Sequence, residues 1–510
     1  MSGFILKRRS YAVASYFRWM RYSSTTNKPF ESIPGLSSLP VIGPIHHFLP
    51  GIGSVGPSAN FFELSKILFE KYGSVVKLDG IFARACLVIL YEPEHFDQVY
   101  RSEDLEAPSR PGFETLVYYR TELRKSTYDG VYGLTTAQGM QWRDFRTKVN
   151  PALLKPKLIK LYTPSLEEIA EDMVARLDEH MAPIKWLFRL KDDVALQSNL
   201  DLEITKWSLE SIAVIALGTR LGCLEDNLTE DHPARVLIKC AKDTTDLALK
   251  LEFFPSLWKF YATSNFKKMM KTLDLQWETS VKFIEDAKRI IKDRAHELPE
   301  EDKSVIEKLI AIDDKVATVM ANEMLFAGID TVAFTTIALL YNLAIHPEIQ
   351  DKLREDIRSA DKSNRYLKAC LKESLRLFPV IPANLRRTTK DHFVAGYHIP
   401  KGVDVVAPHE FLSRMDKNYP RATEFIPERW VVEKSDPLYY GNCHPMVTLP
   451  FGFGVRSCIG RRIAELEIEV FMKRFIRDVK VTWEGPPIQV TSKVINNFKK
   501  PYYFKFETAL

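Results

Sequence analysis

The sequence predicts one large domain that is mainly α-helical with a minor β region. The longest helical run opens at Asp313-Asp314 and ends at about Ile345, before His346-Pro347. Strand-like patterns are short and lie next to tight turns, so we expect the β structure to be local and small. The 510 residues contain no Pro/Gly/Ser linker, internal repeat or low-complexity run that would divide them.

The composition is that of a folded globular protein, with 45% hydrophobic and 27% charged residues. The cysteines are dispersed and form no CxxC pair, which argues against a disulfide framework or a zinc ribbon. Their pattern favours a reducing compartment. The six are Cys86, Cys223, Cys240, Cys370, Cys443 and Cys458.

The formal charge of +5 is concentrated at the N-terminus. Residues 1–30 contain six Lys and Arg residues and no acid, so the rest of the chain sums to −1. This balance does not support a nucleic-acid-binding surface. The leader is rich in Arg, Ser and Tyr and has no unbroken apolar run that could span a membrane. We interpret it as a mitochondrial transit peptide, with a disordered basic tail as the alternative, and assign residues 31–510 to the folded domain.

Several elements follow from caps and turns. Asn60 is expected to cap a helix that Gly73 ends, and segments 75–78 and 86–90 to form a hairpin. Further strands are expected at 393–395 and 403–406, on either side of a turn at 400–402, and at 488–491 and 502–506.

Trp142 and Arg146 occupy positions i and i+4 of a helical pattern, so an indole donor and a guanidinium could reach the same anion. Stacking of the two side chains on a surface is the alternative. In the central helix, Ala327-Gly328-Ile329-Asp330-Thr331 places a glycine and two polar residues in an apolar run. Mid-helix glycine is destabilising by about 1 kcal/mol, which suggests that a flat ligand approaches the backbone here. The alternative is a packing glycine and a threonine bonded to the carbonyl four residues back.

Near the C-terminus, a glycine-rich turn precedes a lone cysteine in Phe451-Gly-Phe-Gly-Val-Arg456-Ser-Cys458-Ile-Gly460, and a helical stripe follows. A thiolate at the start of a helix is a good metal ligand, and we expect the helix terminus and Arg456 to favour its negative form. A buried inert cysteine is the alternative.

This loop resembles the haem-binding loop of the cytochrome P450 superfamily, and the other motifs occur in family order after about residue 34. The resemblance implies the P450 fold, haem b held by the Cys458 thiolate, and a catalytic domain over residues 31–510. It implies that Thr331 and Asp330 deliver protons for oxygen activation, and that Glu373, Arg376 and Arg429 form a buried structural triad. The residues expected to contact haem are Trp142, Arg146, Arg387 (with Arg386 as the competing choice), Arg456, Ala327, Gly328 and Phe451.

Two basic pairs resemble the animal mitochondrial branch of the family. Lys368 and Lys372 lie at i and i+4 on a predicted helix, and Arg461 and Arg462 follow the cysteine. Together they would form a positive patch for an acidic electron donor, which in that branch is an adrenodoxin-type [2Fe–2S] ferredoxin. The segment between Leu353 and Lys368 is shorter than is typical of the family.

The sequence therefore predicts a haem-thiolate monooxygenase that inserts one oxygen atom of O₂ into an apolar substrate, sterol-like or xenobiotic. The resemblance also implies peripheral association with the matrix side of the inner membrane, through the region of Phe253, Phe254, Trp258, Phe260 and Tyr261, for which core packing is the alternative. Two other functions remain open, a haem-thiolate isomerase or dehydratase and a non-catalytic haem sensor or lipid carrier. Asp330, Thr331 and the basic patch argue against both.

Overall fold

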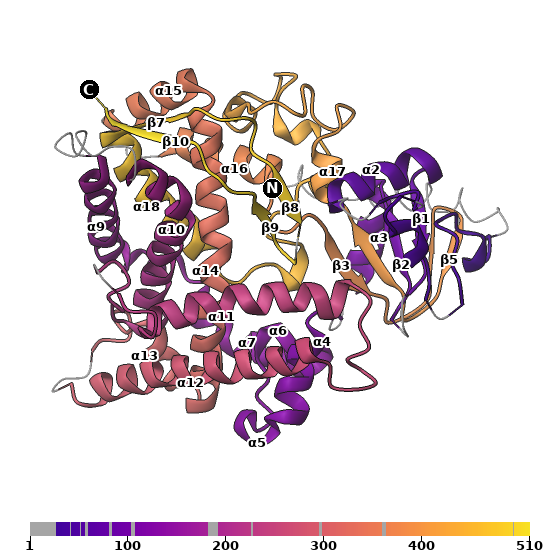
Figure 1. Ribbon diagram of the computed structural model, residues 1–510, viewed down its shortest axis with the longest axis horizontal. Coiled ribbons are helices and arrows are strands. Elements are labelled where there is room, and N and C mark those ends of the chain that lie inside the picture. Colours follow the sequence, from indigo (N-terminus) through magenta and orange to yellow (C-terminus); the bar gives the residue numbers. More distant parts are fainter. Residues whose placement is uncertain are drawn as a thin grey trace, which may run out of the picture.

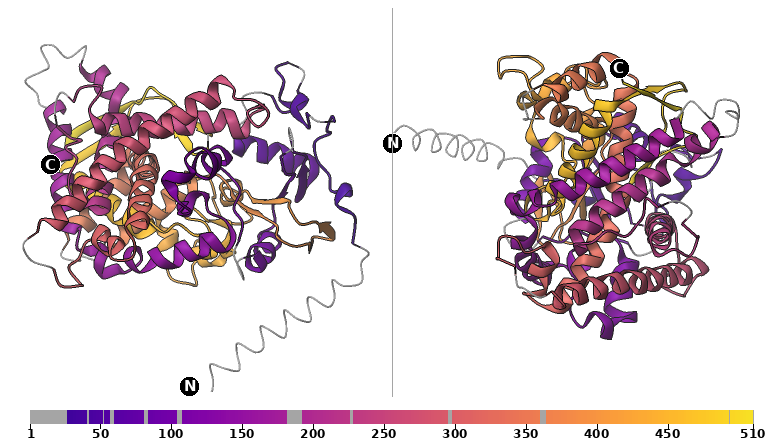
Figure 2. Two further views of the ribbon diagram at one scale, coloured as in Figure 1. Left: turned by 90° about the horizontal axis from the view of Figure 1, so that it is seen from below. Right: turned by 90° about the vertical axis from the view of Figure 1, so that its left-hand side faces the viewer.

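The computed structural model describes residues 27–509 except 41, 52, 57–59, 81–83, 104–107, 182–191, 226–227, 295–297, 360–363 and 493. A large helical lobe and a smaller lobe that contains strands lie side by side, each around its own apolar core (Figures 1 and 2). The mainly α-helical fold with a minor β region is confirmed. The predicted leader falls largely outside the described residues, but Lys28 is inside them and its N–H donates to the Gly396 carbonyl.

Helices account for most of the larger lobe. The principal ones are α7 (Gly139–Leu153), α9 (Thr163–Met181), α10 (Asp192–Leu217), α11 (Pro233–Ala248), α12 (Ser264–Lys292), α14 (Asp314–Ala344), α15 (Pro347–Arg358), α16 (Arg365–Leu377) and α18 (Arg461–Asp478). Shorter helices join them, namely α4 (Glu114–Tyr118), α5 (Lys125–Tyr128), α6 (Gly133–Thr136), α8 (Pro156–Lys160) and α13 (Val305–Ile310). The smaller lobe contributes α2 (Phe61–Tyr72), α3 (Pro93–Glu103) and α17 (His409–Ser413).

The central helix α14 crosses the middle of the larger lobe (Figure 1). Asp313 caps it by accepting a hydrogen bond from the Val316 N–H at 2.8 Å, as the sequence predicts. The helix packs along α10 and also contacts α11, α12, α13, α16 and β7 (Val479–Trp483). Of the described helices, it alone has the length and apolar character needed to cross a membrane. Because 72% of its apolar window is buried inside the protein, it is a core helix here.

The β structure is small but not local. β1 (Val75–Leu78) and β2 (Leu87–Leu90) form the expected hairpin, and β2 then pairs in parallel with β6 (Asp404–Ala407), more than 300 residues later. β3 (Asn384–Arg387) completes this sheet in the order β1-β2-β6-β3. The expectation of local β structure was wrong, because short patterns do not reveal their partners. The other pairs are β4 (His392–Val394) with β5 (Tyr397–Ile399), β7 with β10 (Phe504–Thr508), and β8 (Val490–Ser492) with β9 (Asn496–Phe498).

The smaller lobe shows how the predicted caps act. Asn60 and Glu63 form a reciprocal capping box at the start of α2, and Gly73 ends the helix with a φ of 86°. The chain then enters β1 directly. The sheet of this lobe lies next to the cysteine loop. At the start of β3 the Asn384 side chain donates a hydrogen bond of 3.1 Å to the carbonyl of Leu449, which lies just before the loop.

Candidate active site

The cysteine loop is a tight turn closed by backbone hydrogen bonds. The Cys458 N–H donates to the Phe451 carbonyl at 2.8 Å, and the Ser457 N–H donates to that of Gly454 at 3.1 Å. Gly452 and Gly454 have φ values of 75° and 64°, a conformation that residues with a side chain rarely adopt. The Arg461 guanidinium lies 5.1 Å from the centre of the Phe451 ring. The loop thus holds Cys458 at the start of α18, as the sequence predicts.

The surroundings of the Cys458 thiol differ from the expectation in one respect. Burial raises the pKa of Cys458 above its usual value, and this effect exceeds the opposing influence of the Gly460 N–H and of Arg146, Arg110 and Arg461. Arg456, which the sequence predicts to favour the thiolate, makes its hydrogen bonds with Pro108, Ala137 and Gln138. Its guanidinium points instead toward the segment before α7. A bound cation would still favour the thiolate, because metal coordination deprotonates a thiol.

Cys458 borders open space inside the protein. The residue is exposed by surface area, yet burial dominates the pKa of its thiol. Arg110 shows the same combination, since it is exposed while burial, followed by repulsion from Arg386, lowers its pKa. Both side chains therefore keep accessible surface although protein atoms surround them. This combination is typical of residues that line an internal cavity. Arg110 interacts electrostatically with both Cys458 and Glu323 of α14.

The middle of the central helix is open around its predicted catalytic segment. Apart from the first two residues, α14 is buried except for this stretch, where Ala327 is exposed and Phe326, Gly328, Asp330 and Thr331 are partly exposed. Because buried turns flank the open stretch on both sides, a space lies beside the middle of the helix. Ala327 therefore remains a candidate for contact with a ligand.

Gly328 is also partly exposed, but the side of this residue that would carry a side chain faces α10. A Cβ at this position would lie 2.7 Å from Ile212 Cγ1 and 2.9 Å from Ile212 Cβ, both on α10. The Ser208 hydroxyl donates to the Gly328 carbonyl at 2.8 Å. The glycine lets two core helices approach each other, which is the packing alternative that the sequence left open.

The Thr331 hydroxyl donates to the Ala327 carbonyl at 2.8 Å. This is the bond to the residue four positions back that was the alternative to an oxygen-directed hydroxyl. Thr331 and Asp330 are nevertheless both partly exposed within the open stretch of the helix. A rotation of the hydroxyl would redirect its proton at the loss of one neutral hydrogen bond, about 1 kcal/mol.

Trp142 and Arg146 lie together with Arg456. The Arg456 guanidinium stacks on the Trp142 ring with its Cζ atom 3.9 Å from the ring centre, and both side chains are buried. Arg146 lies on the same face of α7, where its Nε–H donates to Asn150 Oδ1 at 2.8 Å. Burial lowers the pKa of Arg146, and the nearby Cys458 opposes that shift. The predicted helix face is therefore directed toward the cysteine.

Arg386, rather than Arg387, faces the cysteine loop. Strand residues alternate between the two faces of a sheet. Arg387 forms a two-pronged ion pair with Asp404 at 2.7 and 2.9 Å, which neutralises its charge. Arg386 is 2% exposed and its Nη2–H donates to the Phe453 carbonyl at 2.9 Å. The geometry favours the competing choice.

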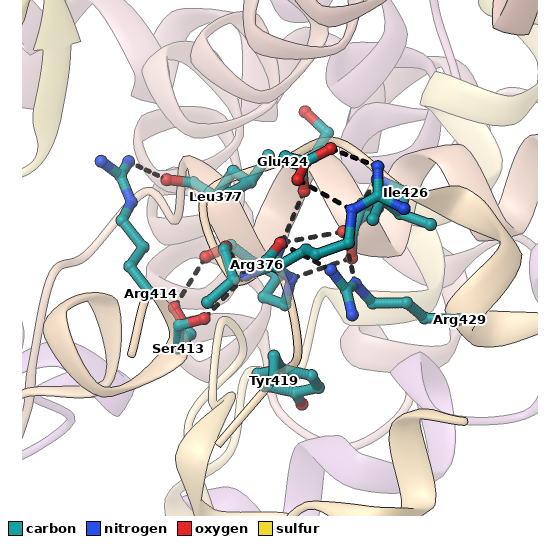
Figure 3. A network of polar contacts seen from close by, with 12 residues as sticks. Arg376, Leu377, Ser413, Arg414, Tyr419, Glu424, Ile426 and Arg429 are labelled. Atoms are coloured by element: carbon teal, nitrogen blue, oxygen red, sulfur yellow. Dashed lines mark hydrogen bonds and ion pairs between the residues drawn. The ribbon is translucent and has the colours of Figure 1, made fainter. Parts of the chain in front are cut away.

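The predicted structural triad is assembled and fully buried. Figure 3 shows two of its members, Arg376 and Arg429, side by side. Arg376 makes two bonds to the Glu373 carboxylate, at 2.8 and 2.9 Å, and the Arg429 Nε–H makes a third at 3.1 Å. The indole N–H of Trp430 donates to the same carboxylate at 2.9 Å. Arg376 also donates to three backbone carbonyls, those of Ser413, Ala422 and Glu424, and so fastens α16 to the segment before the cysteine loop.

The four predicted donor-docking residues are exposed on neighbouring parts of α16 and α18. The Lys368 Nζ atom on α16 lies 3.6 Å from the Glu469 carboxylate, which joins α16 to α18. Lys372 lies 5.7 Å from the centre of the Trp430 ring. Arg461 pairs with Glu465 at 2.9 Å, and Arg462 donates to the Leu154 carbonyl.

Sequence reasoning missed a buried clamp on α14. Glu323 accepts hydrogen bonds from Arg120 at 2.5 Å and from the N–H groups of Leu134 at 2.7 Å and Thr135 at 3.1 Å. A side chain at Gly133, which has a φ of 77°, would collide with this carboxylate. The clamp fastens α6, and with it the start of α7, to the central helix. A charged residue in an apolar helical run was the signal that could have revealed it.

The arrangement fits a flat metal cofactor with carboxylate side chains. The described residues contain no cluster of three or more His, Cys, Asp or Glu side chains that could hold a metal ion. The accessible Cys458 thiol is the candidate ligand in this loop. Arg110, Arg146, Arg386 and Arg456 gather around or near that thiolate, and the burial and repulsion that lower the pKa of Arg110 would be relieved by an anion. Fold and site thus define a haem-thiolate protein.

Comparison with known proteins gives the family. The cytochrome P450 family model matches residues 34–506. Cytochrome P450 CYP12A2 of Musca domestica is 35% identical over 512 residues, which cover 95% of this chain and 93% of the relative. Probable cytochrome P450 12a5, mitochondrial, of Drosophila melanogaster is 35% identical over 505 residues, covering 94% and 91%. Probable cytochrome P450 301a1, mitochondrial, of the same fly is 31% identical over 474 residues, covering 90% and 84%.

The chain belongs to the cytochrome P450 family. It is a monooxygenase whose cofactor is haem iron.

Proposed function

We propose that this protein is a mitochondrial monooxygenase that receives electrons from an adrenodoxin-type ferredoxin and inserts one oxygen atom into an apolar substrate, sterol-like or xenobiotic. The observation that carries the proposal is the accessibility of two positions in the interior of the fold, Cys458 in its loop and the stretch of α14 around Ala327. The mitochondrial part is supported by relatives whose names include that location. It is also supported by the acid-free basic leader.

The residues that would hold haem come from four segments. Cys458 would bind the iron, and Phe451 would pack beside it. Trp142, Arg146 and Arg456 would bind the carboxylates of the cofactor from α7 and the cysteine loop, with Arg386 in place of Arg387. Arg110 joins this set because it is enclosed, electrostatically linked to Cys458 and close to Arg386. When bound, haem supplies the redox and O₂ chemistry.

Thr331 and Asp330 would manage protons on the other side of the space. In this proposal the Thr331 hydroxyl turns from the Ala327 carbonyl into the open space, and Asp330 replaces the proton that it donates. Replacing Thr331 by Ala should leave haem binding intact and should uncouple NADPH consumption from product formation. Normal coupling in that variant would exclude the proton-delivery role.

The electron donor would dock on the basic surface formed by Lys368, Lys372, Arg461 and Arg462. Charge attraction of this kind raises the association rate and weakens with salt. The double variant Lys368→Glu/Lys372→Glu should slow reduction by an adrenodoxin-type ferredoxin, with little effect on reduction by dithionite. Lys417→Glu is a matched control, because Lys417 is exposed but pairs with Glu92 in the other lobe. Equal rates for all three proteins at low salt would contradict the docking surface.

A membrane surface would meet the apolar residues after α11. Phe253, Phe254, Leu257, Phe260 and Tyr261 are between 38% and 70% exposed, whereas Trp258 turns inward and stacks on Phe266 at 5.3 Å. Contiguous exposed aromatic residues are typical of membrane or protein contact. Sedimentation with vesicles of inner-membrane lipid tests this part, since a Phe253→Ser/Phe260→Ser variant should remain in the supernatant.

A further inference from the structure

We propose that Gln138 is a positioning residue that fixes the Arg456 guanidinium, together with the backbone at Arg110, in the orientation needed to bind the carboxylate edge of the cofactor. The proposal rests on the role assigned above to Arg456. Gln138 directly precedes α7 and has an extended backbone, but its side chain does not cap that helix. The side chain is instead directed across to two other segments.

The carboxamide makes a reciprocal pair of hydrogen bonds with one residue. Gln138 Oε1 accepts from the Arg110 N–H at 3.0 Å, and Nε2 donates to the Arg110 carbonyl at 3.0 Å. This pairing fixes which end of the amide is oxygen, because the N–H needs an acceptor and the carbonyl needs a donor. It also fixes the main chain at Arg110, whose guanidinium is enclosed near Cys458.

The same Oε1 atom accepts a second hydrogen bond, from Arg456. The Arg456 Nη2 atom donates to it at 2.9 Å and to the Ala137 carbonyl at 3.3 Å, while Nε donates to the Pro108 carbonyl at 3.0 Å. These bonds and the Trp142 ring fix both the plane and the rotation of the guanidinium. One carboxamide thus joins the segment 108–110, the start of α7 and the cysteine loop.

The chemistry of the acceptors explains why glutamine suits this position. All three oxygens that accept from Arg456 in these bonds belong to neutral groups, so they orient the guanidinium without cancelling its charge. Arg387 provides the contrast, since its ion pair with Asp404 neutralises it. A glutamate at 138 would place a carboxylate against Arg456 and would lose the bond to the Arg110 carbonyl.

The test uses the full-chain holoenzyme and four variants. Gln138→Met keeps the length of the side chain and removes its hydrogen bonds, and Gln138→Glu adds the competing charge. Gln141→Met is the matched control. Gln141 lies in the first turn of α7, three residues after Gln138, and its amide donates to the Gly130 backbone carbonyl at 3.0 Å. Arg456→Met tests the assignment on which the proposal rests. We would measure the rate of haem transfer to apomyoglobin and the reduction potential of the bound haem.

Loss of a hydrogen bond to a charged group should accelerate haem loss by about tenfold or more in Gln138→Met, with Gln141→Met close to wild type. Gln138→Glu should also lower the reduction potential relative to Gln138→Met, because it cancels positive charge near the haem. A purely structural role would not separate these two variants. Equal haem retention in Gln138→Met, Gln141→Met and wild type would overturn the proposal, provided that Arg456→Met loses haem. If Arg456→Met retains haem normally, the role assigned to Arg456 fails instead.

Discussion

The packing role of Gly328 gives the sharpest test of the central helix. In Gly328→Ala, the new methyl group would lie 2.7 to 3.1 Å from three atoms of Ile212. These atoms are its Cγ1, Cβ and Cγ2, and none of them moves when the side chain changes its rotamer at χ2. Overpacking of a core destabilises a protein by about 1 to 3 kcal/mol, whereas alanine gains about 1 kcal/mol over glycine in a helix. We therefore expect a net loss of up to about 2 kcal/mol in the free energy of unfolding.

Urea denaturation of the wild type, Gly328→Ala, Ile212→Ala and the double variant measures this effect. Ile212→Ala removes both Cγ atoms, so the double variant should be more stable than the sum of the single effects predicts. If the glycine instead made room for the cofactor, Gly328→Ala would keep its stability and lose haem affinity. That result, with additive single effects, would refute the packing argument.

Three further predictions follow from buried charged and titratable residues of the structure. Arg386→Met should lose haem faster than wild type, which haem absorbance measures. Arg387→Met should retain haem but unfold at a lower urea concentration, because it leaves Asp404 without its ion-pair partner. Glu323→Gln should destabilise the protein by about 3 kcal/mol by leaving Arg120 buried without its counter-charge, and an Arg120→Met/Glu323→Gln double variant should recover part of that loss. Burial lowers the pKa of His409 to about 4, so the unfolded protein takes up a proton on this residue before the folded protein does as the pH falls. The free energy of unfolding should therefore drop by about 3 kcal/mol between about pH 6.5 and about pH 4. Unfolding curves at several pH values should show a smaller drop in His409→Gln, and equal slopes would contradict the assignment.

Local features of the fold were predictable because their causes lie close together in the sequence. Asn60 and Glu63 cap α2 from positions three apart, and Asp313 begins α14 in the same way. The triad also follows the expected pattern, although Glu373 and Arg429 are distant in sequence, because a family resemblance supplied the pairing. The side chains of α7 similarly lie on one face, as their spacing requires.

Other features depend on partners that no local pattern identifies. Gly328 is required by Ile212 on α10, and the helical period does not tell which face of α14 meets that helix. The choice between Arg386 and Arg387 depends on the register of β3 with β6, since a shift of one residue exchanges the faces. The β2 and β6 pairing and the Glu323 clamp likewise join segments that are far apart in the chain.

The central claim is that Cys458 binds haem iron as a thiolate. The most direct measurement is the absorption spectrum of the purified protein after dithionite reduction and addition of CO. Thiolate ligation predicts the long-wavelength Soret band from which this family takes its name, and Cys458→Ala should abolish it. A folded, haem-loaded wild-type protein that shows only the shorter-wavelength Soret band would contradict the claim, because its iron would then lack the thiolate.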